Sequence, residues 1–217
     1  MSCAICEKRK EKRFCLALHN KICAQCCGEQ REVTLDCPSE CIYLQQARAH
    51  EKPASDRDIP VSELFMRVEV SEQFVYDHDP LLIGLSFSLA KRARAERNLY
   101  DRDLISALSA LATSYQTRMN SGLLYEAPTP SLAQRSIVDE IEKMLAEYRE
   151  LEQKQLGYPK LKDSEVLQGL VFLIRLAFGK SSGRPKSRGF VDFLNVQFPD
   201  NKSGILSSTD AAGSIIT

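Results

Sequence analysis

The chain has 217 residues, 29 basic and 29 acidic side chains, and 43% hydrophobic residues. This length fits one or two domains with a sizeable core. The zero net charge excludes a uniformly basic nucleic-acid binder and an acidic tail protein, although a local basic patch remains compatible with it.

The N-terminal segment carries cysteines at the spacing of metal ligands. All eight cysteines of the chain lie in its first 41 residues: Cys3, Cys6, Cys15, Cys23, Cys26, Cys27, Cys37 and Cys41. Two C-x2-C pairs and one C-x3-C pair in so short a segment favour tetrahedral zinc. Disulfides, an iron–sulfur cluster and redox-active thiols are the alternatives. The first residues have no apolar run typical of a signal peptide, so we expect reduced thiols and a cytoplasmic protein.

Eight cysteines provide enough ligands for two zinc ions. We expect the first ion to be bound by Cys3, Cys6, Cys23 and Cys26, and the second by Cys15, Cys37 and Cys41 with Cys27 or His19 as fourth ligand. Cys27 would complete an all-thiolate set, whereas His19 is evenly spaced between Cys15 and Cys23. A closed shell of four protein ligands leaves no position for water, so both ions are expected to be structural. Because the segment has few large apolar residues, we expect it to be unfolded without metal.

The cysteine order resembles that of B-box-type cross-braced zinc modules, with Cys23-Ala24-Gln25-Cys26 as the central pair. Cys37 and Cys41 stand where B-boxes usually carry histidines. The strings Ile22–Gly28, Cys37–Leu44 and Gly183–Phe190 resemble an uncharacterised family of bacterial cysteine-rich proteins. This resemblance spans most of the chain and implies a zinc module fused to a helical domain. It implies no activity.

After the cysteines, the apolar residues follow a helical period, which predicts a mainly α fold. Residues 1–52 are expected to form the two-zinc module, ending in a helix that begins near Pro38. Residues 53–60 are polar with two prolines and predict a linker. Residues 61–200 predict a helical bundle of about five helices, and residues 201–217 a disordered tail.

The bundle helices are delimited by residues typical of helix ends. They are expected from Ser71 to about Arg97 with a division at Pro80, from an N-cap at Asp101 to Gly122, from Ser131 to Gly157, from an N-cap at Asp163 to Gly179, and from Ser187 or Arg188 to Phe198. In the fourth of these, Val166 to Phe178 is the most apolar segment, so it is predicted to lie at the centre of the bundle.

Two basic segments, Lys8–Arg13 and Lys180–Arg188, are candidate contacts for nucleic acid or another anion. Eight thiolates and two zinc ions would leave the module with a net negative charge, which argues against nucleic-acid binding. For the second segment we favour a structural interpretation, in which Arg184 or Arg188 pairs with helix ends or acidic neighbours and fixes the loop to the bundle.

No catalytic motif is evident, so we expect a protein that is not an enzyme. Asp77-His78-Asp79 has no second histidine nearby, and Asp79 is better explained as a helix cap. We therefore expect an interaction or scaffolding role with a protein partner, through the loops Glu7–Phe14 and Gly28–Asp36. A nucleic-acid-binding regulator and an enzyme with an unrecognised site in the helical domain are the alternatives. No segment is apolar over enough residues to span a membrane, and none is expected to bind one.

Overall fold

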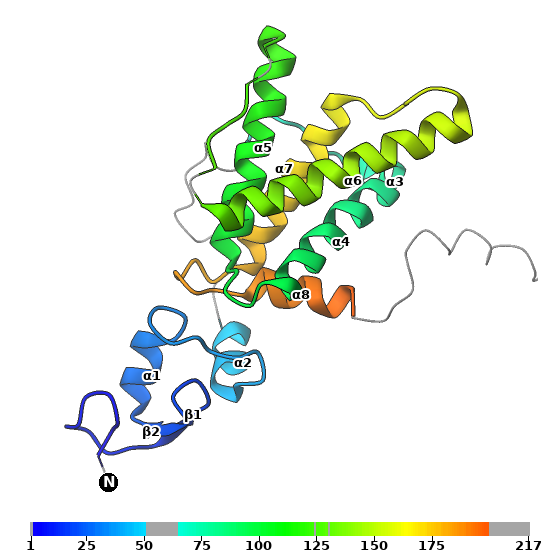
Figure 1. Ribbon diagram of the computed structural model, residues 1–217. Coiled ribbons are helices and arrows are strands. Elements are labelled where there is room, and N and C mark those ends of the chain that lie inside the picture. The colour runs from blue at the N-terminus through cyan, green and yellow to red at the C-terminus, as the bar shows by residue number, and fades with distance from the viewer. Residues whose placement is uncertain (1, 51–64, 124, 130, 200–217) are drawn as a thin grey trace, which may run out of the picture.

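The computed structural model describes residues 2–50, 65–123, 125–129 and 131–199 (Figure 1). In these residues it contains eight helices and one sheet of two short strands, which confirms the predicted mainly α fold class. The predicted linker, residues 53–60, and the predicted tail, residues 201–217, lie outside the described residues.

The N-terminal module combines a small hairpin with two short helices. Its elements are β1 (Arg13–Cys15), β2 (Asn20–Ile22), α1 (Ala24–Gln30) and α2 (Ile42–Ala49). The strands are antiparallel, with Cys15 opposite Asn20, and His19 in the turn has a left-handed backbone. The hairpin is not among the predicted elements, because a strand of three residues is too short to show an alternating pattern.

Six helices follow in the second part of the chain. They are α3 (Glu72–Asp77), α4 (Asp79–Ala95), α5 (Asp101–Ser121), α6 (Leu132–Leu156), α7 (Asp163–Lys180) and α8 (Gly189–Gln197). The predicted helix from Ser71 is divided as expected, since Pro80 lies in the first turn of α4. Ser131 caps α6 and Gly157 ends it in a left-handed conformation, which confirms both predicted ends.

The predicted N-caps of α5 and α7, Asp101 and Asp163, are displaced by one residue, whereas α5 ends before Gly122 as predicted. Asp101 and Asp163 are the first helical residues, and the N-cap positions are held by Tyr100 and Lys162. At its other end α7 continues through Gly179 to Lys180. In both α5 and α7 an acidic side chain at the third helical position accepts the N-cap amide hydrogen, which fixes the start one residue before the predicted one.

Helix α7 lies at the centre of the bundle, as its apolar sequence predicts. Its buried residues share one core with those of α4, α5, α6 and α8. Gly169 of α7 allows close packing against Leu85 of α4, because a Cβ there would lie 3.1 Å from that side chain. Even α7 contains a charged residue, Arg175, which donates to the backbone carbonyls of Phe65 and Val68.

Within the described residues, no helix combines the length and the apolar character that crossing a bilayer requires.

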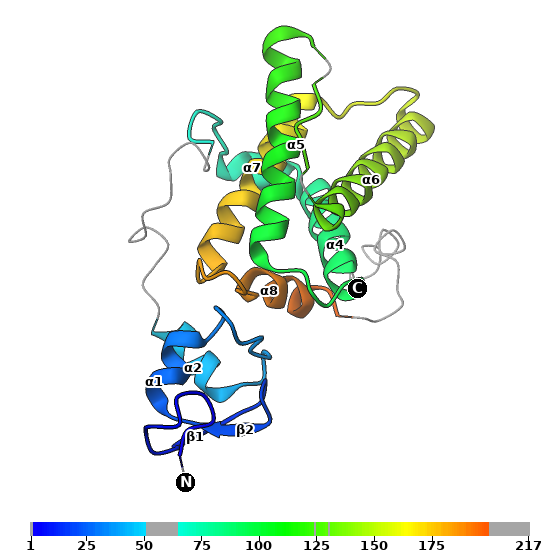
Figure 2. The same ribbon diagram turned by 60° about the vertical axis from the view of Figure 1, so that its left-hand side comes forward.

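The module has a hydrophobic cluster of its own, built from cysteines with Ile22 and Leu35. Figures 1 and 2 both show the module against the end of the bundle where α8 and the loop before it lie. That loop, residues 181–188, provides most of the polar contacts between the two parts described below.

Candidate metal centre

Four cysteines of the module converge in a tight group. The Sγ atoms of Cys3, Cys6, Cys23 and Cys26 all lie within 4.8 Å of one another, and three of these residues are buried. These are the four residues predicted for the first ion. Four thiol sulfurs at this separation can hold one metal ion in a tetrahedral site.

Local backbone structure places these sulfurs. Cys3 and Cys6 lie in a turn that closes when the Glu7 amide donates to the Cys3 carbonyl oxygen, 2.8 Å away. Cys23 is the N-cap residue of α1, and Cys26 lies in the first turn of that helix. The backbone N–H of Cys23 donates to Cys3 Sγ at 3.1 Å, which joins the turn to the helix.

The pKa values of Cys3 and Cys26 are shifted in opposite directions. Burial acts to raise the pKa of Cys3, but hydrogen bonds from the backbone N–H groups of Cys6, Cys23 and Ile5 outweigh it and lower the pKa to about 6. Burial raises the pKa of Cys26 to about 12, and the other cysteines contribute in the same direction. A cation among the sulfurs would allow all four to be thiolates.

Two arginines of the segment Lys8–Arg13 are directed to sulfur atoms. Arg9 Nη1 lies 3.6 Å from Cys23 Sγ and 3.9 Å from Cys26 Sγ. Arg13 Nη1 lies 3.5 Å from Cys27 Sγ, and its guanidinium stacks 4.6 Å from the centre of the Tyr43 ring. These contacts partly neutralise the thiolates and reduce the positive charge that the segment presents to an external anion.

The three cysteines predicted for the second ion, and Cys27 as a candidate fourth ligand, are not grouped as tightly. Cys15, Cys27 and Cys41 are buried and Cys37 is half-buried. Burial raises the pKa of Cys37, and the neighbouring Cys41 and Cys15 raise it further, so these three lie within electrostatic range. Throughout the described part of the chain, however, the first group is the only set of three or more His, Cys, Asp or Glu side chains with ligand atoms this close together.

His19, the alternative fourth ligand, is exposed in the turn between β1 and β2. Cys27, by contrast, is 8% exposed and belongs to the same buried cluster as Cys15. Of the two candidate ligands, only Cys27 therefore lies in the buried cluster that contains Cys15.

The segment Lys180–Arg188 was expected to contact the bundle alone. In the structure it also contacts the N-terminal module. Arg184 Nη1 donates to the carbonyl oxygens of Gly28 and Arg31 at 2.9 and 2.7 Å, and so caps the C-terminal end of α1. Lys186 Nζ lies 2.7 Å from Asp36 Oδ2. The prediction that Arg184 pairs with a helix end is confirmed, but that helix belongs to the module. The loop Gly28–Asp36, predicted as a recognition surface, is therefore in contact with the bundle.

A buried acidic residue joins three segments at this junction, and nothing in the sequence indicated it. Glu32 is 1% exposed, has a left-handed backbone, and accepts hydrogen bonds from Arg48 Nη2 at 2.9 Å and Ser182 Oγ at 2.8 Å. The other amino group of Arg48 donates to Asp192 of α8 at 2.7 Å. Neither the sequence separation of 16 positions from Glu32 to Arg48 nor that of 150 positions from Glu32 to Ser182 is a spacing motif.

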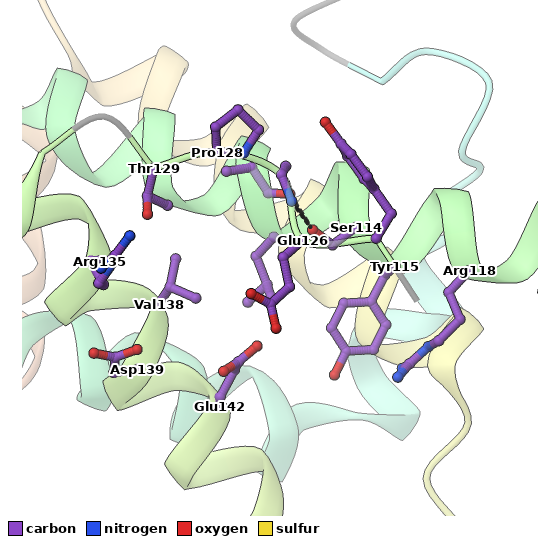
Figure 3. Close-up of a pocket in the computed structure, with 14 residues that line it drawn as sticks. Ser114, Tyr115, Arg118, Glu126, Pro128, Thr129, Arg135, Val138, Asp139 and Glu142 are labelled. Carbon is purple, nitrogen blue, oxygen red and sulfur yellow. Dashed lines mark hydrogen bonds between the residues drawn. The ribbon is translucent and has the colours of Figure 1, made fainter. Parts of the chain in front are cut away.

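A polar pocket of about 780 Å³ lies in the bundle between α5, α6 and residues 125–129 (Figure 3). Figure 3 shows the carboxylates of Glu126 and Glu142 turned toward one another. Burial raises the pKa of Glu142, and Glu126 and Asp139 raise it further. The lining contains no His or Cys, and its serine, Ser114, bonds to backbone groups of Ala110 and Ala127.

The Asp77-His78-Asp79 segment forms neither a metal group nor the predicted cap. His78 is the N-cap residue of α4, and Asp79 is the first residue of that helix. The His78 ring stacks on Phe74 at 4.5 Å, and its Nε2 lies 3.6 Å from a carboxylate oxygen of Glu165. These contacts account for the histidine structurally.

No protein-family model, curated protein or solved structure matches this chain. The resemblance to B-box-type modules therefore stays a prediction, and the function has to be argued from the cysteine group and its surroundings.

Proposed function

We propose that this chain is a zinc-binding protein whose N-terminal module is held together by structural zinc. The observation that carries the proposal is the convergence of the Sγ atoms of Cys3, Cys6, Cys23 and Cys26 within 4.8 Å. Thiolate ligands in a tetrahedral arrangement are typical of zinc, and a closed shell leaves no position for a reacting water. We also propose that the module is of the cross-braced, B-box-like kind.

A second zinc ion, bound by Cys15, Cys27, Cys37 and Cys41, is part of the proposal. It is supported by the burial of Cys15, Cys27 and Cys41 and by the Arg13 guanidinium 3.5 Å from Cys27 Sγ. Because the sulfurs of this set are less tightly grouped, binding of the ion would have to draw them together.

Elemental analysis of the purified protein tests both sites. We expect about two zinc ions per chain, on the order of one in Cys6→Ser and one in Cys41→Ser, and an unchanged content in His19→Ala. His19→Ala is the matched control, because it removes a potential ligand at the surface. Iron with visible absorption, or the absence of bound metal, would contradict the proposal. Loss of one ion in His19→Ala would assign the fourth ligand to the histidine.

We propose further that the module recognises a protein partner. With the loop Gly28–Asp36 in contact with the bundle, the proposed recognition surface is reduced to Glu7–Phe14 and the adjoining hairpin. Support comes from apolar side chains that the hairpin leaves exposed: Phe14 is 50% exposed and Leu18 43% exposed.

Affinity capture with three proteins tests this role. We expect wild type to retain a partner that both Cys23→Ser and Phe14→Ser lose, since the first variant disrupts the zinc site and the second removes only an exposed contact. Phe14→Ser should keep its zinc. Identical partner sets for all three proteins would refute the interaction role without bearing on zinc binding.

A further inference from the structure

Helix α1 connects the metal site to the bundle through its two ends. At its N-terminal end, Cys23 is the N-cap residue and Cys26 lies in the first turn. At its C-terminal end, the carbonyl oxygens of Gly28 and Arg31 accept hydrogen bonds from Arg184 of the bundle. A helix of 7 residues therefore carries two of the proposed metal ligands at its N-terminal end and the contact with Arg184 at its C-terminal end.

A helix of this length is not stable alone in water. It needs external contacts at its ends, where the backbone N–H and C=O groups have no partners within the helix. A metal ion on Cys23 and Cys26 would fix the first turn, and Arg184 satisfies the last carbonyl groups. Each of these two contacts therefore favours the helical state that the other requires.

Glu32, directly after α1, provides a second connection of the same kind. Its side chain accepts from Arg48 and Ser182, and its carbonyl oxygen accepts from the Lys186 backbone N–H at 2.7 Å. Its left-handed backbone, at φ 53°, is unfavourable for a side-chain-bearing residue and persists only where the surroundings fix it. If α1 lost its helical structure, the position of Glu32 and its three bonds would be lost with it.

We propose that metal binding at Cys3, Cys6, Cys23 and Cys26 and docking of the loop 181–188 onto the module are thermodynamically coupled. The inference rests on the proposed metal binding and adds a consequence for the bundle. Metal loss releases Ser182, Arg184 and Lys186 from their partners on the module. Conversely, weakening the docking contact weakens metal binding by the same factor.

Hydrogen–deuterium exchange of the full-length chain tests the first half of the coupling. The protein is compared with bound zinc and after chelation. We expect the amide of Lys186, which donates to Glu32, to exchange at least several-fold faster after chelation, whereas the amide of Val171 in the buried face of α7 keeps its rate. If zinc is bound and its removal leaves the exchange at Lys186 unchanged, the coupling is refuted and the zinc proposal stands.

Zinc affinity of docking variants tests the reciprocal half, by competition of Zn²⁺ with a chromophoric chelator. We expect Arg184→Ala to bind zinc more weakly, by roughly 5- to 150-fold, the usual range for coupled sites. The matched control is Lys180→Ala, because Lys180 belongs to the same basic segment but its amino group lies over the Phe193 ring, within the bundle. Arg184→Lys keeps the positive charge but lacks the planar guanidinium group. Its zinc affinity should therefore lie between those of Arg184→Ala and Lys180→Ala.

The outcomes separate this inference from the proposed function. Equal zinc affinity in Arg184→Ala, Lys180→Ala and wild type overturns the coupling. A wild-type chain that binds no zinc overturns the proposed function and the coupling together. Circular dichroism of Arg184→Ala with zinc bound verifies that the bundle helices are intact, so a lower affinity cannot be attributed to global unfolding.

Discussion

Asp101 shows how one buried side chain can organise the loop that contacts the N-terminal module. It is 0% exposed, although it is the first residue of α5. Its carboxylate accepts hydrogen bonds from Ser187 Oγ at 2.7 Å and from the backbone N–H groups of Phe190 and Val191 at 3.1 Å each. It thus caps α8 in place of the N-cap residue Arg188, whose side chain makes no cap bond. The loop 181–188 is held at its far end by this contact.

The ionisation of Asp101 predicts a pH-dependent difference in stability. Burial raises the pKa of Asp101, and the hydrogen bonds from Ser187, Val191 and Phe190 offset this only in part. The folded state therefore binds this proton more tightly than the unfolded state, and its stability falls as the pH rises from the ordinary value of 3.8 through the raised pKa. Relative to Asp101→Asn, wild type should lose unfolding free energy over that window, as measured by urea titration at several pH values.

Asp101→Ala removes the carboxylate that caps α8, and the resulting loss of unfolding free energy should be measurable at neutral pH. This change leaves two buried N–H groups without acceptors, so we expect a cost of about 2–4 kcal/mol in unfolding free energy. Asp139→Ala removes an exposed carboxylate of the same size and should change the stability by no more than about 0.5 kcal/mol. Equal effects of the two changes, or a constant difference between wild type and Asp101→Asn across the pH range, would contradict the role given to Asp101.

At the scale of elements, α8 begins in direct contact with the end of α7. Gly189, the first residue of α8, has no room for a side chain, because a Cβ there would overlap the backbone carbonyl oxygen of Lys180. Gly179, in the last turn of α7, has nothing within 4 Å of the corresponding position. The two glycines are close in sequence and differ in packing.

These two glycines predict opposite effects of the same substitution. Gly189→Ala should lower the unfolding free energy by about 1–3 kcal/mol, because backbone atoms that cannot rotate away must move. Gly179→Ala should raise it by about 0.5–1 kcal/mol, because alanine restricts the unfolded chain and favours the helix. Thermal unfolding followed by circular dichroism compares them. A stabilising effect of Gly189→Ala would show that α8 does not pack as described.

The elements differ in how well the sequence predicts them, and the difference has a physical cause. Helix α6 is delimited by local signals, Ser131 at its start and Gly157 at its end, and both predictions are confirmed. The hairpin and α1 were not predicted, because elements this short depend on neighbouring contacts and have weak intrinsic propensity. The first cysteine group was predicted from spacing within the chain, whereas Glu32 has partners that only the tertiary structure brings together.

At the scale of the whole molecule, the described residues form two hydrophobic cores of unequal composition. The large one joins side chains of the bundle helices, and no cysteine belongs to it. The small one consists of Ile22, Leu35 and five cysteines, with a few half-buried residues around it. A core this small cannot offset the conformational entropy of ordering the module, so the proposed metal binding would have to supply the difference.

The two cores predict that metal removal unfolds one part of the chain and spares the other. After chelation we expect chymotrypsin to cleave rapidly next to Phe14 and Tyr43, while the bundle resists digestion and retains most of its helical circular dichroism. Cys23→Ser with zinc present should be cleaved next to Phe14 faster than wild type, because a missing ligand opens the tetrahedral site that Cys23 shares with Cys3, Cys6 and Cys26. The interface between the module and the loop 181–188 is mainly polar and contributes little to the bundle core. The unfolding temperature of the bundle should therefore fall by only a few degrees, which corresponds to about 1 kcal/mol. A chelated module that stays protected at Phe14 would mean that packing alone, without metal, holds it together.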